Sequence, residues 1–250
     1  MSNTMTSGAL VSVAGGRPIL SSQYLQQHKV GTSGKDVIWQ PLRDQQLYPS
    51  TGQTSFKFFS EPIGGGNSAA FGAGTQAKTE YDTNVEIASL LGQGNEFYQI
   101  GLEFIYLPGI LASSTTPAIQ PGQGNVASGS IGEYVNDVHT VGAGGLVTEK
   151  IGTNREYIQD GPLSLFPPAT RLIVQAALSS IAPTTQATQE NCQINHAVWG
   201  GEPYVIVPIY IASLQKFTLS LQYAAAIPTP SGVGGLLIAR ARGYYIRQVT

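Results

Sequence analysis

Residues 204–246 read YVIVPIYIASLQKFTLSLQYAAAIPTPSGVGGLLIARARGYYI, and this stretch largely determines the expected fold. Residues 217–223 alternate large apolar side chains with Thr, Ser and Gln, which is the period-2 pattern of a half-buried strand. Residues 204–211 are apolar on both faces, as in a strand between two layers, and residues 236–246 read as a final strand. Turn residues separate the three segments, so the pattern predicts antiparallel β-structure.

The same signals continue toward the N-terminus. Residues 97–107 place large apolar side chains at even positions, so one face should carry Tyr98, Ile100, Leu102, Phe104 and Tyr106. Shorter strands are predicted at residues 36–39, 54–59, 145–151, 156–158 and 163–166. Residues 83–91 and 171–181 fit either a short helix or a strand.

No segment shows a sustained helical apolar stripe, so the predicted class is all-β: an antiparallel sandwich, barrel or jelly roll. An eight-stranded roll needs on the order of 100 residues at the usual strand spacing. The chain therefore has room for two rolls, at 31–135 and 136–250, with a loop rich in small polar residues at 112–130. Residues 1–30 are expected to form an N-terminal arm that neighbours order, or a frayed terminus.

Charge is scarce in this chain. Only 11% of residues are charged and the net charge is −2, whereas soluble domains have about 25% charged residues. The mean hydropathy is zero, because Ser, Thr, Gln and Asn take the place of the missing charges. Neutral surfaces associate readily, so the composition favours an assembly subunit over an enzyme and argues against a broad basic face for nucleic acid.

Targeting and redox signals are few. Cys192 is the single cysteine, which excludes an internal disulfide and a cysteine-based zinc site and fits a reducing compartment. The first basic residue is Arg17, so the N-terminus lacks the basic region of a signal peptide. No apolar run reaches the ~18 residues that span a bilayer.

The three histidines limit acid–base chemistry. His28 has no carboxylate within helical reach, whereas His139 follows Glu133 and Asp137, a trio that a metal could use. His196 lies near Cys192, but a nucleophilic pair also needs an orienting third group. A packed cysteine and a surface histidine are the favoured interpretation. We therefore predict no catalytic, cofactor-binding or metal-binding residues, no cofactor and no enzymatic activity.

Two glycine-containing segments resemble functional motifs but lack the structural context that these motifs require. Residues 128–132, Ser-Gly-Ser-Ile-Gly, resemble a nucleophile elbow but begin with Ser where Gly is needed and lack the strand-to-helix setting. Residues 72–77 match a dinucleotide loop superficially, yet no βαβ unit surrounds them.

The only local basic cluster consists of Arg240, Arg242 and Arg247. The i, i+2 spacing places Arg240 and Arg242 on one face of a strand. They could contact lipid head groups or nucleic acid. The favoured interpretation is an edge strand protected by charge, or pairing with carboxylates of a neighbouring copy.

Two stretches resemble a known family. One runs from Tyr81-Asp82-Thr83-Asn84-Val85-Glu86 through residues 94–100, preceded by Phe58-Phe59, and the other is residues 235–249. Together they resemble major capsid proteins of small tailless icosahedral bacteriophages, some of which contain an internal membrane. The resemblance implies a double jelly roll with short loops that stands upright in the shell as a trimer.

The predicted function is therefore that of a major capsid subunit that self-assembles into an icosahedral virion shell in the host cytoplasm. Its expected partners are its own copies, as homotrimer and lattice, and other virion proteins. An internal membrane or the packaged genome is a further partner on the inner face. The alternative is a receptor- or carbohydrate-binding β-sandwich, in which Trp199 beside Gly200-Gly201 would stack on sugars. A β-sandwich hydrolase using His139 or His196 with carboxylates ranks third.

Overall fold

The computed structural model describes residues 10–13, 17–20, 35–69, 76–108, 131–152, 159–167, 172–178, 193–199 and 204–248. The polar loop predicted at 112–130 and the strand predicted at 156–158 lie outside these residues. Within them the chain is mostly β, with antiparallel sheets, so the expectation of an all-β fold is confirmed.

The larger sheet has the order β11-β6-β13-β3, formed by Tyr204–Ile211, Asn95–Pro108, Gly235–Gln248 and Lys35–Trp39. Strand β4, Leu42–Tyr48, also pairs with β13. It continues β3 after Gln40-Pro41, because β3 pairs with the C-terminal part of β13 and β4 with the N-terminal part. Proline has no N–H to donate to a ladder, which accounts for an interruption at this point.

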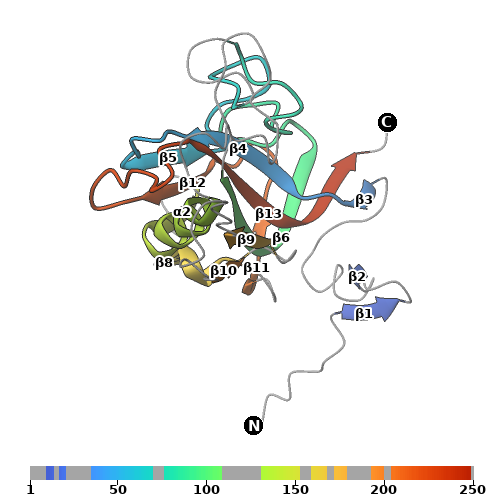
Figure 1. The fold of residues 1–250 in the computed structure, drawn as a ribbon. Helices are drawn as coiled ribbons and strands as arrows, with labels where there is room; N and C mark the ends of the chain where they lie inside the picture. The colour runs from blue at the N-terminus through green and yellow to red at the C-terminus, as the bar shows by residue number, and fades with distance from the viewer. Residues whose placement is uncertain are drawn as a thin grey trace, which may run out of the picture.

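The smaller sheet has the order β5-β12-β7-β8, formed by Ser55–Phe58, Phe217–Gln222, Leu146–Ile151 and Gln159–Pro162. All of its pairings are antiparallel. Figure 1 shows β5 and β12 side by side, to the left of the long strands β6 and β13.

The pairing follows a single rule when β3 and β4 are counted as one strand. The first strand pairs with the last (β3/β4 with β13), and the second with the seventh (β5 with β12). The third pairs with the sixth (β6 with β11), and the fourth with the fifth (β7 with β8). This is a long antiparallel hairpin rolled into two facing sheets, which is the connectivity of one eight-stranded jelly roll.

The division into rolls at 31–135 and 136–250 therefore does not describe these sheets. Strands from both ranges are hydrogen-bonded in both sheets: β5 pairs with β12, and β6 pairs with β11 and β13. Long connections explain why one roll spans more residues than the predicted ~100. They run from β5 to β6, from β6 to β7 and from β8 to β11.

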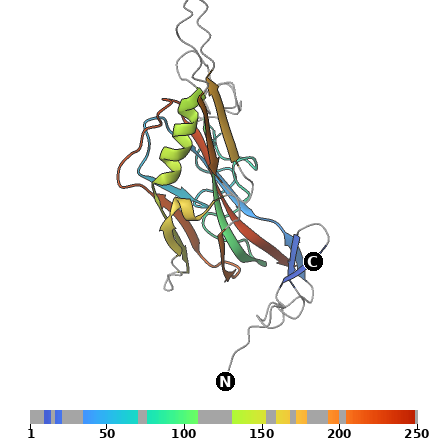
Figure 2. The same ribbon diagram turned by 60° about the horizontal axis from the view of Figure 1, so that its bottom comes forward.

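Elements outside the roll lie in the arm and in these connections. The arm contains a hairpin of β1 (Leu10–Val13) and β2 (Arg17–Leu20), which pair with each other. A second hairpin, β9 (Leu172–Leu178) and β10 (Gln193–Trp199), follows β8. Helix α2 (Ile131–Ala143) packs against this hairpin and β6, and Figure 2 shows it lying alongside the strands.

Four local predictions were wrong or undecided, and the structure resolves them. Helix α2 was missed although Ile131, Val135, Val138 and Val141 recur at helical spacing. Residues 163–166 were predicted as a strand, but Leu163–Leu165 form a 3₁₀ turn. Residues 83–91 form turns and isolated bridges rather than a helix or a strand, and residues 172–178 of the ambiguous segment 171–181 form a strand.

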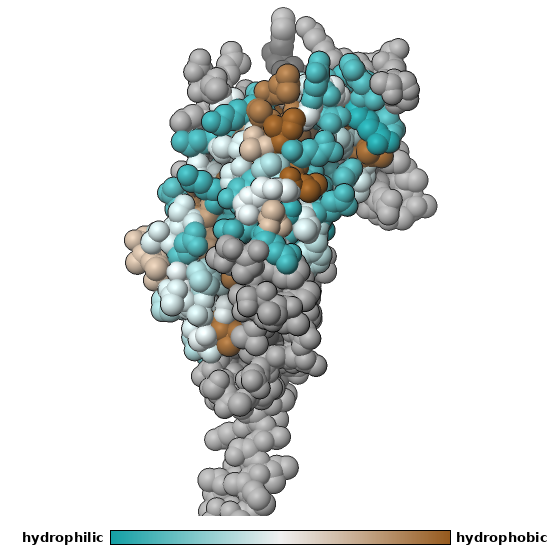
Figure 3. Space-filling model, turned by 90° about the horizontal axis from the view of Figure 1, so that it is seen from above, coloured by the Kyte–Doolittle hydropathy of each residue, from teal (hydrophilic) through white to brown (hydrophobic). Residues whose placement is uncertain are grey.

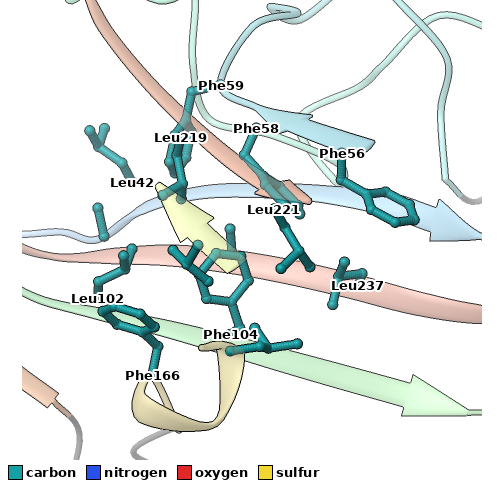
Figure 4. Close-up of a cluster of buried hydrophobic side chains, with 14 of the residues drawn as sticks. Leu42, Phe56, Phe58, Phe59, Leu102, Phe104, Phe166, Leu219, Leu221 and Leu237 are labelled. Atoms are coloured by element: carbon teal, nitrogen blue, oxygen red, sulfur yellow. The ribbon is translucent and has the colours of Figure 1, made fainter. Parts of the chain in front are cut away.

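The core lies between the two sheets. The large apolar side chains that fill it come from β4, β5, β6, β12 and β13, with Phe166 after the 3₁₀ turn (Figure 4). Phe58 and Phe104, one from each sheet, meet edge to face with ring centroids 5.4 Å apart. Tyr48 of β4 and Phe56 of β5 are instead stacked, with ring centroids 5.3 Å apart and an interplanar angle of 17°. Burial of these rings stabilises the roll.

A β-bulge divides the long strands β6 and β13 into two parts. The register shifts between Arg242 and Gly243, opposite residues 99–101 of β6. Leu102, Phe104 and Tyr106 belong to the core, whereas Tyr98 belongs to a second cluster on the outer face with Tyr244 and Ile246. The predicted single face of residues 98–106 was therefore wrong, because one extra residue reverses the alternation.

Candidate interaction surfaces

The arginines of β13 lie on the outer face of the larger sheet, away from the core. Strand β13 lies inside the sheet with neighbours on both sides, so the interpretation of a charge-protected edge was wrong. Arg240 and Arg242 share the outer face, as the spacing predicted, since Ala239 and Ala241 point into the core.

Each of these arginines has a partner within its own chain. Arg240 Nη1 lies 3.7 Å from Oε1 of Glu103, its register partner on β6. Arg247 donates from Nε and Nη2 to Oδ2 of Asp36 at 3.2 and 3.0 Å. The guanidinium of Arg242 lies 5.6 Å from the ring centroid of Trp39, a cation–π contact.

A further ion pair extends this pattern on the same sheet. Lys35 Nζ donates to Glu96 Oε1 at 2.7 Å. Lys35, Arg240 and Arg247 are thus matched by carboxylates of the same chain, and Arg242 lies over an aromatic ring. Such pairing reduces the positive potential that a phosphate or a lipid head group would meet.

The connection between β5 and β6 covers the edge of the larger sheet at β4. Residues 82–84 run beside β4 like a short extra strand: Gln45 N donates to Asp82 O at 2.9 Å and Asn84 N to Arg43 O at 3.1 Å. In addition, the side-chain Oδ1 of Asn84 accepts a hydrogen bond from Arg43 N at 2.7 Å. The polar backbone of β4 is therefore satisfied from within the chain.

An ion pair in which both side chains are buried anchors this connection. Lys78 Nζ lies 2.6 Å from Oδ1 of Asp44, and both side chains are essentially inaccessible. Asp44 Oδ2 also accepts from Phe59 N at 2.7 Å. Burial raises the pKa of Asp44 to about 6, although the Lys78 charge and these hydrogen bonds oppose the rise.

Asp82 organises the rest of this connection. Its Oδ1 accepts from Ala69 N at 2.9 Å and its Oδ2 from Thr79 N at 2.9 Å. One carboxylate thereby joins segments on either side of residues 70–75. Neither Lys78–Asp44 nor Asp82 was singled out from the sequence, because no local pattern marks them.

The sheet edges at β11, β8 and β5 have features that disfavour strand addition. Pro208 interrupts the hydrogen-bonding edge of β11, where the register also shifts between Val205 and Ile209. Strand β8 ends in Gly161-Pro162, and β5 has only four residues with Lys57 exposed. The exposure of Pro208 and Tyr210 also shows that β11 is not buried on both faces, contrary to expectation.

A shallow groove of about 630 Å³ lies over β4, β5 and the connection that follows β5. Its lining is mainly amide and hydroxyl side chains, with one lysine and one glutamate. The lining residues are Gln46, Leu47, Pro49, Gln53, Ser55, Lys57, Ser60, Glu61, Asn67, Ser68 and Ala69. No aromatic ring is among these described residues, so this groove offers no platform for stacking a sugar.

The predicted chemistry candidates lie apart or outside the described residues. His139 is exposed on α2, whereas Asp137 is buried and accepts from Ser231 N at 2.9 Å and Ser231 Oγ at 2.5 Å. His196 and Trp199 lie on β10; Cys192, His28, residues 70–75 and residues 128–130 are outside the described ranges. In those ranges, no group of three His, Cys, Asp or Glu side chains could hold a metal ion.

The described part of the chain also contains no helix long and apolar enough to cross a membrane. Comparison with protein-family models, with curated proteins and with solved structures gives no match for this chain.

Proposed function

We propose that this chain is a structural subunit of a virus particle that self-assembles into an icosahedral shell. The observation that carries the proposal is the pairing of the eight strands, first with last through fourth with fifth. Jelly rolls of this kind build viral capsid domains, and also lectin domains and cupins. The fold alone is therefore compatible with several classes of protein, and the properties of the molecular surface must distinguish among these classes.

The surface supports association through neutral contacts. In the view of Figure 3, pale and teal residues cover most of the described face and the brown apolar residues form small separate groups. Lys35, Arg240 and Arg247 of the larger sheet are paired with carboxylates of the same chain. A surface of this kind provides little electrostatic repulsion between copies, as the net charge of −2 already suggests.

The sheet edges support side-chain contacts rather than a continuous intermolecular sheet. Residues 82–84 cover β4, and Pro208 and Pro162 interrupt β11 and β8. Copies would then meet through loops and sheet faces, which allows closed assemblies of defined size instead of open-ended fibres.

The proposed partners are other copies of the chain, as homotrimers and a shell lattice, together with other virion proteins. A membrane or the packaged genome would lie against the inner face. The proposed location is the virion, after assembly in the host cytoplasm. Since the described strands of the two sheets form one roll, a capsomer built from these rolls needs twice as many chains as a capsomer built from double jelly rolls.

The full-length chain, purified and examined by sedimentation velocity and negative-stain electron microscopy, tests this proposal. We expect discrete trimers or larger species at micromolar concentration, and closed particles under some conditions. A strictly monomeric protein would overturn the proposal. A glycan-binding screen of the same preparation tests the alternative, since saturable sugar binding by an isolated subunit would favour a carbohydrate-binding module.

A further inference from the structure

A glutamate lies in the apolar space between the two sheets. Glu149 is on β7, between Val147 and Ile151 on the same face, and only 2% of it is accessible. Its register partner on β12 is Leu219, also in the core. A carboxyl group in this position has lost its hydration and requires compensation from the protein.

The compensation comes from the opposite sheet. Gln99 on β6, fully buried, donates from Nε2 to Oε2 of Glu149 at 3.0 Å. Among the described residues, this is the one hydrogen bond to the Glu149 carboxyl group. It joins the two sheets across the core.

The Gln99 amide has an unused acceptor. Its Oε1 is buried and has no hydrogen-bond partner. An ionised carboxylate has only acceptors, so it cannot supply the missing proton, whereas a protonated carboxyl group has one O–H to donate. Protonation thus permits a reciprocal pair, with the amide N–H donating to one carboxyl oxygen and the carboxyl O–H donating to the amide oxygen.

No cation among the described residues faces Glu149 to stabilise its ionised form. On β6 and β13, Glu103, Arg240 and Arg242 lie on the outer face. On β7, Lys150 is exposed and follows Glu149 directly in the strand, so it lies on the face away from Glu149. Strand β12 contains no ionisable residue.

The tyrosines of the adjoining strands do not supply a charge either. The Tyr98 and Tyr210 register pair of β6 and β11 lies on the outer face, and Tyr106 lies beyond Phe104 in the core. Tyr245 of β13 packs at the margin of the core, where burial first and then Glu86 raise its pKa. Burial likewise raises the pKa of Glu149 to about 7, opposed only by the Gln99 hydrogen bond.

We propose that Glu149 is a proton-controlled latch between the two sheets of the roll. In the protonated state Glu149 and Gln99 tie β7 to β6 without burying a charge. Loss of the proton leaves a negative charge in the core with a single hydrogen bond, which loosens the contact between the sheets. The latch is a property of the folded subunit, so it holds whether or not copies assemble.

The sign of the pH dependence follows from the raised pKa. Below pH ~4.5 the group is protonated in both folded and unfolded chains and has no effect. Between about pH 4.5 and 7 the folded chain holds a proton that the unfolded chain has released, so stability falls as pH rises. Above about pH 7 both states are ionised and the loss is complete.

The main experiment compares urea unfolding of the wild-type chain and the Glu149→Gln variant from acid to mildly alkaline pH. The variant retains a neutral hydrogen-bonding amide of nearly the same shape. We expect the unfolding equilibrium constant of the wild type relative to the variant to rise by about two orders of magnitude between pH ~4.5 and ~7.5. Asp44, whose pKa is also raised, is unchanged in the variant, so the difference isolates Glu149.

Glu80→Gln, at an exposed position, is the matched control and should keep the wild-type pH profile. If the stability of the wild type and that of Glu149→Gln changed with pH in the same way, the proposal would be overturned. NMR of wild-type protein labelled at the glutamate carboxyl carbons provides a test that needs no variant. One glutamate should titrate near pH 7, and titration of every glutamate below pH ~5.5 would equally overturn it.

Discussion

Lys78 and Asp44 are the residues on which the connection between β5 and β6 depends most. Their ion pair is buried on both sides, and Glu61 Oε2, 3.9 Å from Lys78 Nζ, is the other carboxylate near the lysine. Replacing a buried pair by apolar residues can be neutral, but removing one partner leaves a charge with no compensation. The contribution of the pair is therefore tested through a single substitution.

We expect Lys78→Met to destabilise the fold by about 3–5 kcal/mol near pH 8, where Asp44 would be left ionised in the core. The effect should shrink toward pH 4, because Asp44 accepts a proton there and no buried charge remains. Urea unfolding at the two pH values measures both effects. Lys57→Met removes an exposed lysine and is the matched control; equal stabilities for the two variants would contradict the assigned role.

At the scale of elements, the bulge in β6, opposite Arg242 and Gly243 of β13, decides which side chains of β6 enter the core. Gly243 stands at the register shift, where a side chain has no room. A Cβ at this position would overlap the carbonyl oxygen of Tyr98 and lie 2.8 Å from Cζ of Phe97. The close approach of β6 and β13 at the bulge therefore requires glycine.

We expect Gly243→Ala to cost about 3 kcal/mol or more, because backbone of a central strand must move to accept the methyl group. Gly232→Ala, in a turn where nothing lies within 4 Å of the added atom, should cost only about 1 kcal/mol for its positive φ. Thermal unfolding of both variants provides the measurement. A Gly243→Ala protein as stable as Gly232→Ala would show that the bulge is not a fixed feature of the fold.

The elements of the fold differ in how well the local sequence pattern predicts them. Strands β6, β7, β12 and β13 could be predicted, because alternation or long apolar runs mark them directly. The spacing of its apolar residues could have identified helix α2. The core position of Glu149 could also have been predicted, because it lies two residues from both Val147 and Ile151 and so shares their face of the strand. The bulge could not have been predicted, since one extra residue in a pairing leaves no mark on the sequence of either strand.

At the scale of the whole molecule, the scarcity of charge and the pairing of charges within the chain bear on assembly. Arg240, Arg247 and Lys35 already contact Glu103, Asp36 and Glu96 of the same subunit. Contacts between copies would then rest mainly on neutral polar and apolar groups, which salt does not screen.

We therefore expect the oligomers to keep their size when NaCl is raised from about 0.05 to 0.5 M, a range over which screening between exposed charges becomes strong. Sedimentation velocity across this range is the measurement. Dissociation at high salt would instead show that ion pairs between copies hold the assembly together. The Glu149→Gln variant should behave like the wild type in this experiment, because its substitution is inside the core.

The sequence by itself determined the all-β class, the positions of the long strands, the shared face of Arg240 and Arg242, and the nearly neutral composition. All of these depend on neighbours in the chain, because side-chain alternation has a period of two. Only the tertiary structure decided that the described strands of the two sheets form one roll, which of them pair, and that Lys78 meets Asp44 and Gln99 meets Glu149. Partners such as Arg247 and Asp36 are 211 positions apart. Hydrogen bonding and packing between such distant segments depend on the whole fold, not on local pattern.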